Sequence, residues 1–398
     1  MVRIRYRTGL VICTFLLSLN ASSNDRLSKI RQLVDNGCVM LDDENGKRLI
    51  AINGDGFFVP ASIIKVLTSQ IALDVLGADF RFKTECYTDS RSDLIIKGYG
   101  DPFLVSGEIR FLARALKEKG CTTVNRVLLD RSYFSGDLSI PGISSTSNPY
   151  DALNGALVVN FNTVNVGKNS SGIIYSAEKE TPLTPIAKAR AAAFSPGTRQ
   201  RINLSADREA CARYAGELFV TIFREQGITV ADSMVGEATV GADREPLLTY
   251  YNSRSLPEVL KGLLKYSNNF IANQLFLSIG AREKGAPATM AKGKAVFEQY
   301  IREKLAIPES QLIMVEGSGI SRENRVSGTV MLSIMERFRP NVELLSLKNG
   351  HPVKSGTLHG VNNYAGYFST ASGLRPFVII LNQKKANRDA VMKLLERF

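Results

Sequence analysis

Three short polar elements have residue types and spacing that could carry chemistry. The first is the pair Ser62 and Lys65, a hydroxyl with an amine that could activate it as a nucleophile. Residues three apart share one face of a helix, so the Lys65 amine is expected beside the Ser62 hydroxyl. An amine kept deprotonated by burial or by a neighbouring cation can take the hydroxyl proton, which makes the serine a nucleophile. Ser176 and Lys179 repeat the spacing, so the pair has to be judged together with the other two elements.

The second element is the polar cluster Ser267-Asn268-Asn269, which interrupts a long helical pattern. Serine and asparagine compete for backbone hydrogen bonds and are unfavourable inside helices. The cluster therefore predicts a break where polar groups are presented. A simple helix–helix turn is the alternative interpretation.

The third element is Lys354-Ser355-Gly356-Thr357, on a predicted strand late in the chain. Lysine and glycine are depleted in strands, and a strand glycine often marks the close approach of a ligand or of another backbone segment. A lysine beside it would supply a cation suited to a carboxylate. The alternative is an edge-strand lysine that guards against aggregation.

The elements that must position these residues predict an α+β fold. Pro60 and Ala61 before Ser62 indicate a helix start, and Gly77 indicates its end. Helical periodicity dominates the middle of the chain, whereas strands are predicted near both ends. The main predicted strands are 38–41, 48–51, 353–358, 364–369 and 376–381, and a final helix is predicted at 387–398. An antiparallel sheet built from both chain ends and flanked by helices follows from this order.

Composition changes along the chain predict three parts. Residues 1–23 combine early arginines, a short apolar run and small residues, which is typical of a cleaved export signal; an uncleaved anchor is the alternative. Residues 24–80 and 205–398 are expected to form one domain. Residues 81–204, rich in short strands and loops, are expected to form an inserted β-rich domain. The protein is therefore predicted to be exported to the periplasm.

The charge and the cysteines restrict the partners. The net charge of +12 favours anionic polymers such as cell wall, or at most peripheral contact with membranes, and no concentrated basic run points to nucleic acid. The cysteines left after signal removal allow two disulfides or four free thiols; they are Cys38, Cys86, Cys121 and Cys211. With two histidines and no CxxC pair, neither a zinc site nor a thioredoxin-like motif is supported.

In the order Ser-x-x-Lys, Ser-x-Asn, Lys-Ser/Thr-Gly, the three elements match the set of penicillin-binding proteins and serine β-lactamases. The chain most resembles the class C low-molecular-mass penicillin-binding proteins, which are DacB-like D-alanyl-D-alanine carboxypeptidases and endopeptidases. Further resembling stretches are 60–67, 99–102, 159–164, 317–327 and 354–367. The chain departs from the family in having Ser355 for the usual threonine, Glu316 for the usual aspartate, and a shorter insert between Val166 and Leu204.

The resemblance implies a penicillin-binding, β-lactamase-like transpeptidase fold and an acyl-enzyme mechanism without a cofactor. By resemblance, Ser62 is the nucleophile, Lys65 the general base, Ser267 the proton shuttle and Asn269 a hydrogen-bonding partner of the acyl chain and of Lys65. Lys354 would bind the terminal carboxylate. The expected substrate-binding residues beside it are Ser355, Gly356 and Thr357.

The implied partners are peptidoglycan stem peptides and cross-links, with β-lactam antibiotics as covalent inhibitors. Two alternatives share the fold: a serine β-lactamase and a catalytically silent peptidoglycan-binding protein. The large insert argues against the first, and the complete motif set argues against the second. A Ser-His-Asp hydrolase is disfavoured because the chain has no G-x-S-x-G.

Overall fold

The computed structural model describes residues 23–204, 207–241, 243–385 and 387–398. The predicted export signal lies outside these residues, except for Ser23. The described chain divides into two compact units. The terminal unit contains residues 23–63, 309–313 and 323–398, and the central unit contains residues 64–308 and 314–322. The proposed boundaries of an insert at 81–204 remain a prediction.

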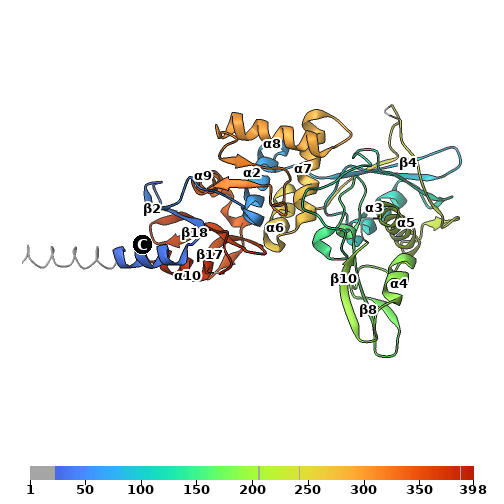
Figure 1. Cartoon of the computed structure of the whole chain (residues 1–398). Helices are drawn as coiled ribbons and strands as arrows, with labels where there is room; N and C mark the ends of the chain where they lie inside the picture. The colour runs from blue at the N-terminus through green and yellow to red at the C-terminus, as the bar shows by residue number, and fades with distance from the viewer. Residues whose placement is uncertain (1–22, 205–206, 242, 386) are drawn as a thin grey trace, which may run out of the picture. The chain divides into compact units, whose positions relative to one another are not determined.

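The terminal unit is built on a six-stranded antiparallel sheet in the order β16-β17-β18-β19-β1-β2 (Figure 1). Its strands are β1 (Gly37–Asp42), β2 (Arg48–Ile52), β16 (Leu347–Lys348), β17 (His351–Leu358), β18 (Val361–Thr370) and β19 (Gly373–Leu381). The order places both chain ends side by side, as the sequence predicts. The predicted hairpin at 38–51 is confirmed as the β1–β2 pair.

Both faces of this sheet are covered, which explains why β1 is buried along its whole length. Val39 and Leu41 pack in a cluster with Ile30 and with side chains of α10 (Arg388–Leu395). The alternate residues Cys38 and Met40 lie against Gly328, at the start of α9 (Gly328–Phe338). The strand period of two therefore supplies two apolar layers.

The remaining elements of the terminal unit are short. They are β3 (Phe57–Phe58), β14 (Leu312–Ile313) and β15 (Arg325–Ser327), which form a small sheet, and the 3-10 helix η4 (Arg339–Leu344). The chain then passes through the 3-10 helix η1 (Ala61–Ile64) into α2.

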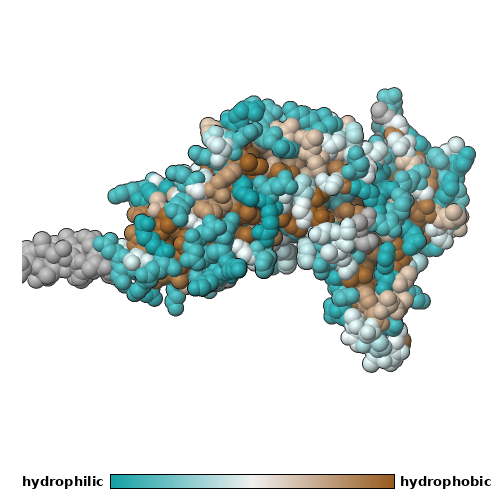
Figure 2. All heavy atoms as spheres, in the orientation of Figure 1, coloured by the Kyte–Doolittle hydropathy of each residue, from teal (hydrophilic) through white to brown (hydrophobic). Residues whose placement is uncertain are grey.

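The helical part of the central unit is organised around α2 (Lys65–Leu76), which packs against α6 (Leu256–Tyr266) and α7 (Asn269–Lys284). Helix α2 is buried on nearly all sides, as is α7. Helix α8 (Met290–Lys304) packs on α7, and hydrophilic side chains cover its outer side (Figure 2). As predicted, α2 ends before Gly77, which has a φ of 87°.

The rest of the central unit contains a five-stranded mixed sheet in the order β12-β7-β5-β4-β13. Its strands are β4 (Lys83–Thr88), β5 (Leu94–Gly98), β7 (Val127–Asp130), β12 (Val235–Glu237) and β13 (Leu248–Tyr251). Helices α3 (Ser106–Glu118) and α5 (Arg208–Glu225) supply much of the apolar core against it. Strands β5, β7 and β12 run parallel.

The smaller elements of the central unit include a sheet that extends away from this core in Figure 1. It contains β8 (Thr163–Lys168), β9 (Ile174–Ser176) and β10 (Thr198–Asn203), with α4 (Pro185–Ala192) beside it. The remaining elements are the β6 (Thr123–Val124) and β11 (Thr229–Val230) pair and the 3-10 helices η2 (Pro149–Asp151) and η3 (Asn160–Asn162).

The four cysteines of the described chain are buried and unbridged, which decides between the two alternatives left by the sequence. Burial raises the pKa of the Cys38 thiol to about 12, so this thiol is protonated and unreactive at neutral pH. None of the helices in the described residues combines the length and hydropathy that a bilayer span requires.

Candidate active site

Ser62 lies in η1, in a backbone segment that the terminal unit holds tightly. Ala61, directly before it, has a left-handed φ of 47°, a conformation that costs a non-glycine residue about 1–3 kcal/mol. The segment is held by Asn363 on β18, whose Nδ2 donates to the carbonyl oxygens of Val59 at 3.0 Å and of Pro60 at 2.7 Å. This strained, anchored turn fixes where the Ser62 side chain begins.

Gly356 on β17 lies directly against the same segment. A Cβ placed at this position would lie 3.0 Å from the backbone nitrogen of Ser62 and 2.9 Å from the carbonyl oxygen of Pro60. No larger residue fits without moving the backbone, which is the close approach that a strand glycine predicts. The terminal unit thus brings the predicted third element beside Ser62.

Lys354 is buried on β17, and its Nζ donates to the carbonyl oxygen of Ser355 at 2.8 Å. Burial and, to a lesser degree, the charge of Arg388 lower the pKa of Lys354 to about 8. Arg388 donates to the carbonyl oxygen of Gly356 at 3.1 Å and to Thr357 Oγ1 at 2.8 Å. The side chains of Ser355 and Thr357 are exposed. The Arg388 cation therefore lies at the exposed Thr357 hydroxyl, a combination that suits a carboxylate.

Lys65, the first residue of α2, is fully buried in the central unit. Its Nζ donates to Asn269 Oδ1 at 2.8 Å and to the carbonyl oxygen of Ser318 at 2.6 Å. Both acceptors are neutral, so the contacts suit either protonation state of the amine. The structure therefore brings the first and second predicted elements together at Lys65 and Asn269.

The loop that carries Ser318 was not identified as part of the site from the sequence. The buried carboxylate of Glu316 accepts hydrogen bonds from the backbone N–H of Ser318 and of Gly319, each at 2.7 Å, and from Ser318 Oγ at 2.6 Å. Thr68 Oγ1 donates to the carbonyl oxygen of Gly317 at 2.6 Å. Glu316, which replaces the family's aspartate, thus holds the acceptor of Lys65 in place. The signal that could have found it is the run Gly317-Ser318-Gly319 after an acidic residue.

Ser267 and Asn269 lie at the predicted helix break. Helix α6 ends at Tyr266, Ser267 adopts a left-handed conformation with φ 52° and ψ 39°, and α7 begins at Asn269. Asn268 caps α7 by accepting a hydrogen bond from the backbone N–H of Ile271 at 3.1 Å. Ser and Asn residues are used here for the turn and cap geometry they favour.

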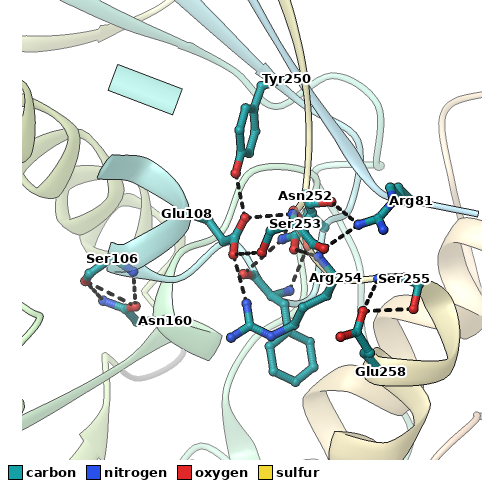
Figure 3. A network of polar contacts seen from close by, with 12 residues as sticks. Arg81, Ser106, Glu108, Asn160, Tyr250, Asn252, Ser253, Arg254, Ser255 and Glu258 are labelled. Carbon is teal, nitrogen blue, oxygen red and sulfur yellow. Dashed lines mark hydrogen bonds and ion pairs between the residues drawn. The ribbon is translucent and has the colours of Figure 1, made fainter. Parts of the chain in front are cut away.

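A buried network fixes the other end of α6 (Figure 3). The carboxylate of Glu108 on α3 accepts hydrogen bonds from Ser253 Oγ at 2.6 Å, Arg254 Nη1 at 2.9 Å and Tyr250 Oη at 2.6 Å. A capping box between Ser255 and Glu258 then starts the helix. The segment from β13 to Ser267 is therefore held at both ends.

The two histidines lie outside the three predicted elements. His351 contacts Glu396 Oε1 through Nε2 at 2.9 Å and accepts a hydrogen bond from the backbone N–H of Ser369 at 3.1 Å. His359 is exposed in the turn after β17. No cluster of metal-ligating side chains occurs within the described part of the chain.

A family model described as the D-Ala-D-Ala carboxypeptidase 3 (S13) family matches residues 20–172 and 195–353. The chain belongs to this family. The predicted family and enzyme class are confirmed: it is a serine-type D-Ala-D-Ala carboxypeptidase. The family model does not match residues 173–194, which lie within the stretch where the insert is expected to be shorter.

Two curated relatives match the sequence of this carboxypeptidase over most of its length. A D-alanyl-D-alanine carboxypeptidase of Actinomadura sp. (strain R39) is 26% identical over 92% of this chain and 83% of its own length. The D-alanyl-D-alanine carboxypeptidase DacB of Haemophilus influenzae is also 26% identical, over 93% of this chain and 91% of its own.

The solved structure of penicillin-binding protein 4 (dacB) from Haemophilus influenzae has the same fold. It superposes with a TM-score of 0.74 at 22% identity, over 93% of this chain and 97% of that one. A second structure of that protein is complexed with a β-lactam and has a TM-score of 0.69. The predicted fold class is thereby confirmed.

Proposed function

We propose that this carboxypeptidase is exported and removes the terminal D-alanine from peptidoglycan stem peptides through an acyl-enzyme on Ser62. One observation carries the assignment of the site. The buried amine of Lys65, three residues after Ser62, donates to Asn269 Oδ1 and to the carbonyl oxygen of Ser318. In the proposed mechanism this amine takes the Ser62 proton as the general base.

The proposed acylation step moves one proton and exchanges one bond. Ser62 Oγ attacks the carbonyl carbon between the two D-alanines while its proton passes to Lys65 Nζ. The carbonyl oxygen becomes an oxyanion, stabilised by the backbone N–H groups of Ser62 and Thr357. The proton then reaches the leaving amine through Ser267, the C–N bond breaks, and D-alanine departs. Water hydrolyses the remaining ester.

Substrate orientation is assigned to the strand β17. The Lys354 cation and the hydroxyls of Ser355 and Thr357 would bind the terminal carboxylate of the peptide. The same chemistry on a cross-linked D-alanyl bridge would give endopeptidase activity, which we propose as a second reaction of the site.

Covalent labelling by penicillin tests this assignment. The purified mature protein is incubated with a fluorescent penicillin, and the adduct is located by peptide mass spectrometry. A persistent adduct on Ser62, with D-alanine released from a pentapeptide, is the expected result. Rapid loss of the label with drug hydrolysis would instead indicate a β-lactamase, and absence of label would indicate a silent binding protein.

Export is tested separately. We propose that residues 1–23 are removed, so the N-terminal sequence of the protein recovered from the periplasm should start at or near Asn24. Recovery of the full-length chain in the membrane fraction would favour the uncleaved anchor.

A further inference from the structure

A chain of hydrogen bonds links the buried amine of Lys65 to a buried carboxylate through one peptide group of the central unit. Lys65 Nζ donates to the carbonyl oxygen of Ser318 at 2.6 Å. The N–H of the same peptide group belongs to Gly319, and it donates to Glu316 Oε1 at 2.7 Å. Hydrogen bonds in such a chain polarise one another. The carboxylate therefore makes the Ser318 carbonyl a stronger acceptor for the Lys65 amine.

Both oxygens of the Glu316 side chain accept hydrogen bonds, as those of an ionised carboxylate do. Oε2 accepts from the backbone N–H and the Oγ of Ser318, and Oε1 accepts from the backbone N–H of Gly319 and, at 3.2 Å, of Ser321. The side chain is fully buried. A charge in such surroundings is screened far less than one at the surface. A negative charge thus lies one peptide group away from Lys65.

Neutral groups of α2 and α7 also hold the loop that carries this peptide group. Thr68 Oγ1 donates to the carbonyl oxygen of Gly317 at 2.6 Å, and Asn273 Oδ1 accepts from its backbone N–H at 2.8 Å. Gly317 lies against the backbone of α7, since an added Cβ would be 2.7 Å from the carbonyl oxygen of Ala272. The position of the loop therefore does not depend on the carboxylate alone, and its charge can be tested separately from its contacts.

The other ionisable side chains on the elements around Lys65 are exposed. They are Asp74 on α2, Arg322 in the loop, Glu258, Lys261, Lys265 and Tyr266 on α6, and Arg282, Glu283 and Lys284 in the last turn of α7. Solvent and salt screen exposed charges strongly. Among the described residues of α2, α6, α7 and this loop, Lys65 and Glu316 are therefore the two buried ionisable groups.

We propose that Glu316 is a positioning residue that stabilises the protonated form of Lys65 through the peptide group of Ser318 and Gly319. The inference rests on the proposed function, in which Lys65 Nζ takes the proton of Ser62 Oγ. Burial by itself disfavours the ammonium that this transfer creates. The charge of Glu316 offsets part of that cost, which keeps the amine basic enough to accept the proton near neutral pH. The proton stays on Nζ until it moves to the leaving amine, and Glu316 is not protonated.

The pH dependence of acylation tests this role. The second-order rate constant for acylation of the mature protein by a chromogenic β-lactam is measured by stopped-flow over the acidic and neutral range. Its acidic limb reports the protonation of the essential base in the free enzyme. Glu316→Gln removes the charge, so the limb should move to lower pH by about one unit, and the rate at the optimum should fall about tenfold. Glu316→Asp keeps the charge and should leave the limb at the wild-type pH.

Thr68→Val is the matched control, because it removes the hydrogen bond to Gly317 and keeps the charge of Glu316. It is expected to slow acylation at every pH without moving the acidic limb. An acidic limb that stays at the wild-type pH in Glu316→Gln would overturn the proposal, since a structural role alone lowers the rate and leaves the limb in place. An equal displacement of the limb in Thr68→Val would overturn it as well.

Thermal unfolding shows whether each variant is folded. If Glu316→Gln does not fold, Asn269→Asp replaces it, because this change places a carboxylate at a hydrogen-bond acceptor of Lys65. The acidic limb should then move to higher pH, and an unmoved limb would overturn the proposal because the limb would not report Lys65. Labelling of Ser62 in the wild type with an unmoved limb in Glu316→Gln refutes the role of Glu316 alone. A wild type that is never labelled refutes the proposed function and this inference with it.

Discussion

Ser62–Lys65 and Ser176–Lys179 share one spacing but lie in very different surroundings. Lys65 is fully buried and donates to Asn269 and Ser318, and it follows the strained turn at Ala61. Ser176 ends the short strand β9, its Oγ donates to the carbonyl oxygen of Glu178 at 3.0 Å, and Lys179 is exposed. The spacing thus allows a Ser–Lys pair, but the environment of the lysine decides whether it can act as a base.

The strongest test of this contrast replaces each of the two serines by alanine, one at a time. Ser62→Ala should abolish covalent labelling by penicillin and D-alanine release, because no other hydroxyl is held in the anchored turn. Ser176→Ala should leave both unchanged. Labelling is followed on gels and by mass spectrometry. Loss of label in Ser176→Ala would break the comparison.

Alanine substitutions of Lys65 and Lys179 should differ almost as much in their effect on acylation. Lys65→Ala is expected to slow acylation by about 10²–10⁴-fold, the usual contribution of a general base, while Lys179→Ala keeps the wild-type rate. The rate is measured by stopped-flow with a chromogenic β-lactam. Because Lys65→Ala leaves buried acceptors unpaired at a cost of about 1–3 kcal/mol, thermal unfolding is recorded as the control. A folded Lys65→Ala protein that acylates normally refutes the base assignment.

A substitution of Asn269 tests how much the hydrogen-bond acceptors of Lys65 contribute to the acylation rate. Asn269→Ala removes one partner of Lys65 Nζ, and a loss of about 1–2 kcal/mol corresponds to about 5- to 30-fold slower acylation. Asn268→Ser, which preserves the helix cap, serves as the matched control and should be close to wild type. If both variants slowed acylation equally, the effect would come from the helix break and not from the contact with Lys65.

Lys354 tests whether a second buried lysine acts as a cation, in contrast to the base role proposed for Lys65. Its pKa of about 8 means that the cation needed for carboxylate binding is lost as the pH rises through 8, so kcat/KM should fall above that pH. Burial lowers this pKa most, and Arg388 adds a like charge. Arg388→Gln should therefore raise the pKa and shift the basic limb to higher pH. A basic limb of the kcat/KM profile that stays at the same pH in Arg388→Gln would show that Lys354 does not cause it.

The smallest effect is expected at Ser355. Ser355→Thr restores the family's usual residue, keeps the exposed hydroxyl, and adds a β-branch that strands favour. D-alanine release should change by no more than about twofold, by analogy with other surface substitutions that cost under about 0.5 kcal/mol. A large change in KM would show that the hydroxyl geometry differs from that of threonine.

Much of the fold could be predicted because it depends on local patterns. The helix that ends at Gly77, the break at Ser267 and the hairpin at 38–51 all follow from periodicity, turn residues and caps within a few positions. The state of the cysteines could not be predicted, since it depends on distances between strands and helices far apart in the sequence.

For the site, the sequence by itself determined which groups are available and in what order: Ser62 with Lys65, then Ser267 and Asn269, then Lys354 before Gly356. Tertiary structure alone decided what surrounds them. Only folding could bring the Ser318 carbonyl to Lys65, hold it through Glu316, and press Gly356 against the backbone of Ser62. The physical reason is that motif spacing is a local property, whereas burial and hydrogen-bond partners come from residues as far as 304 positions away.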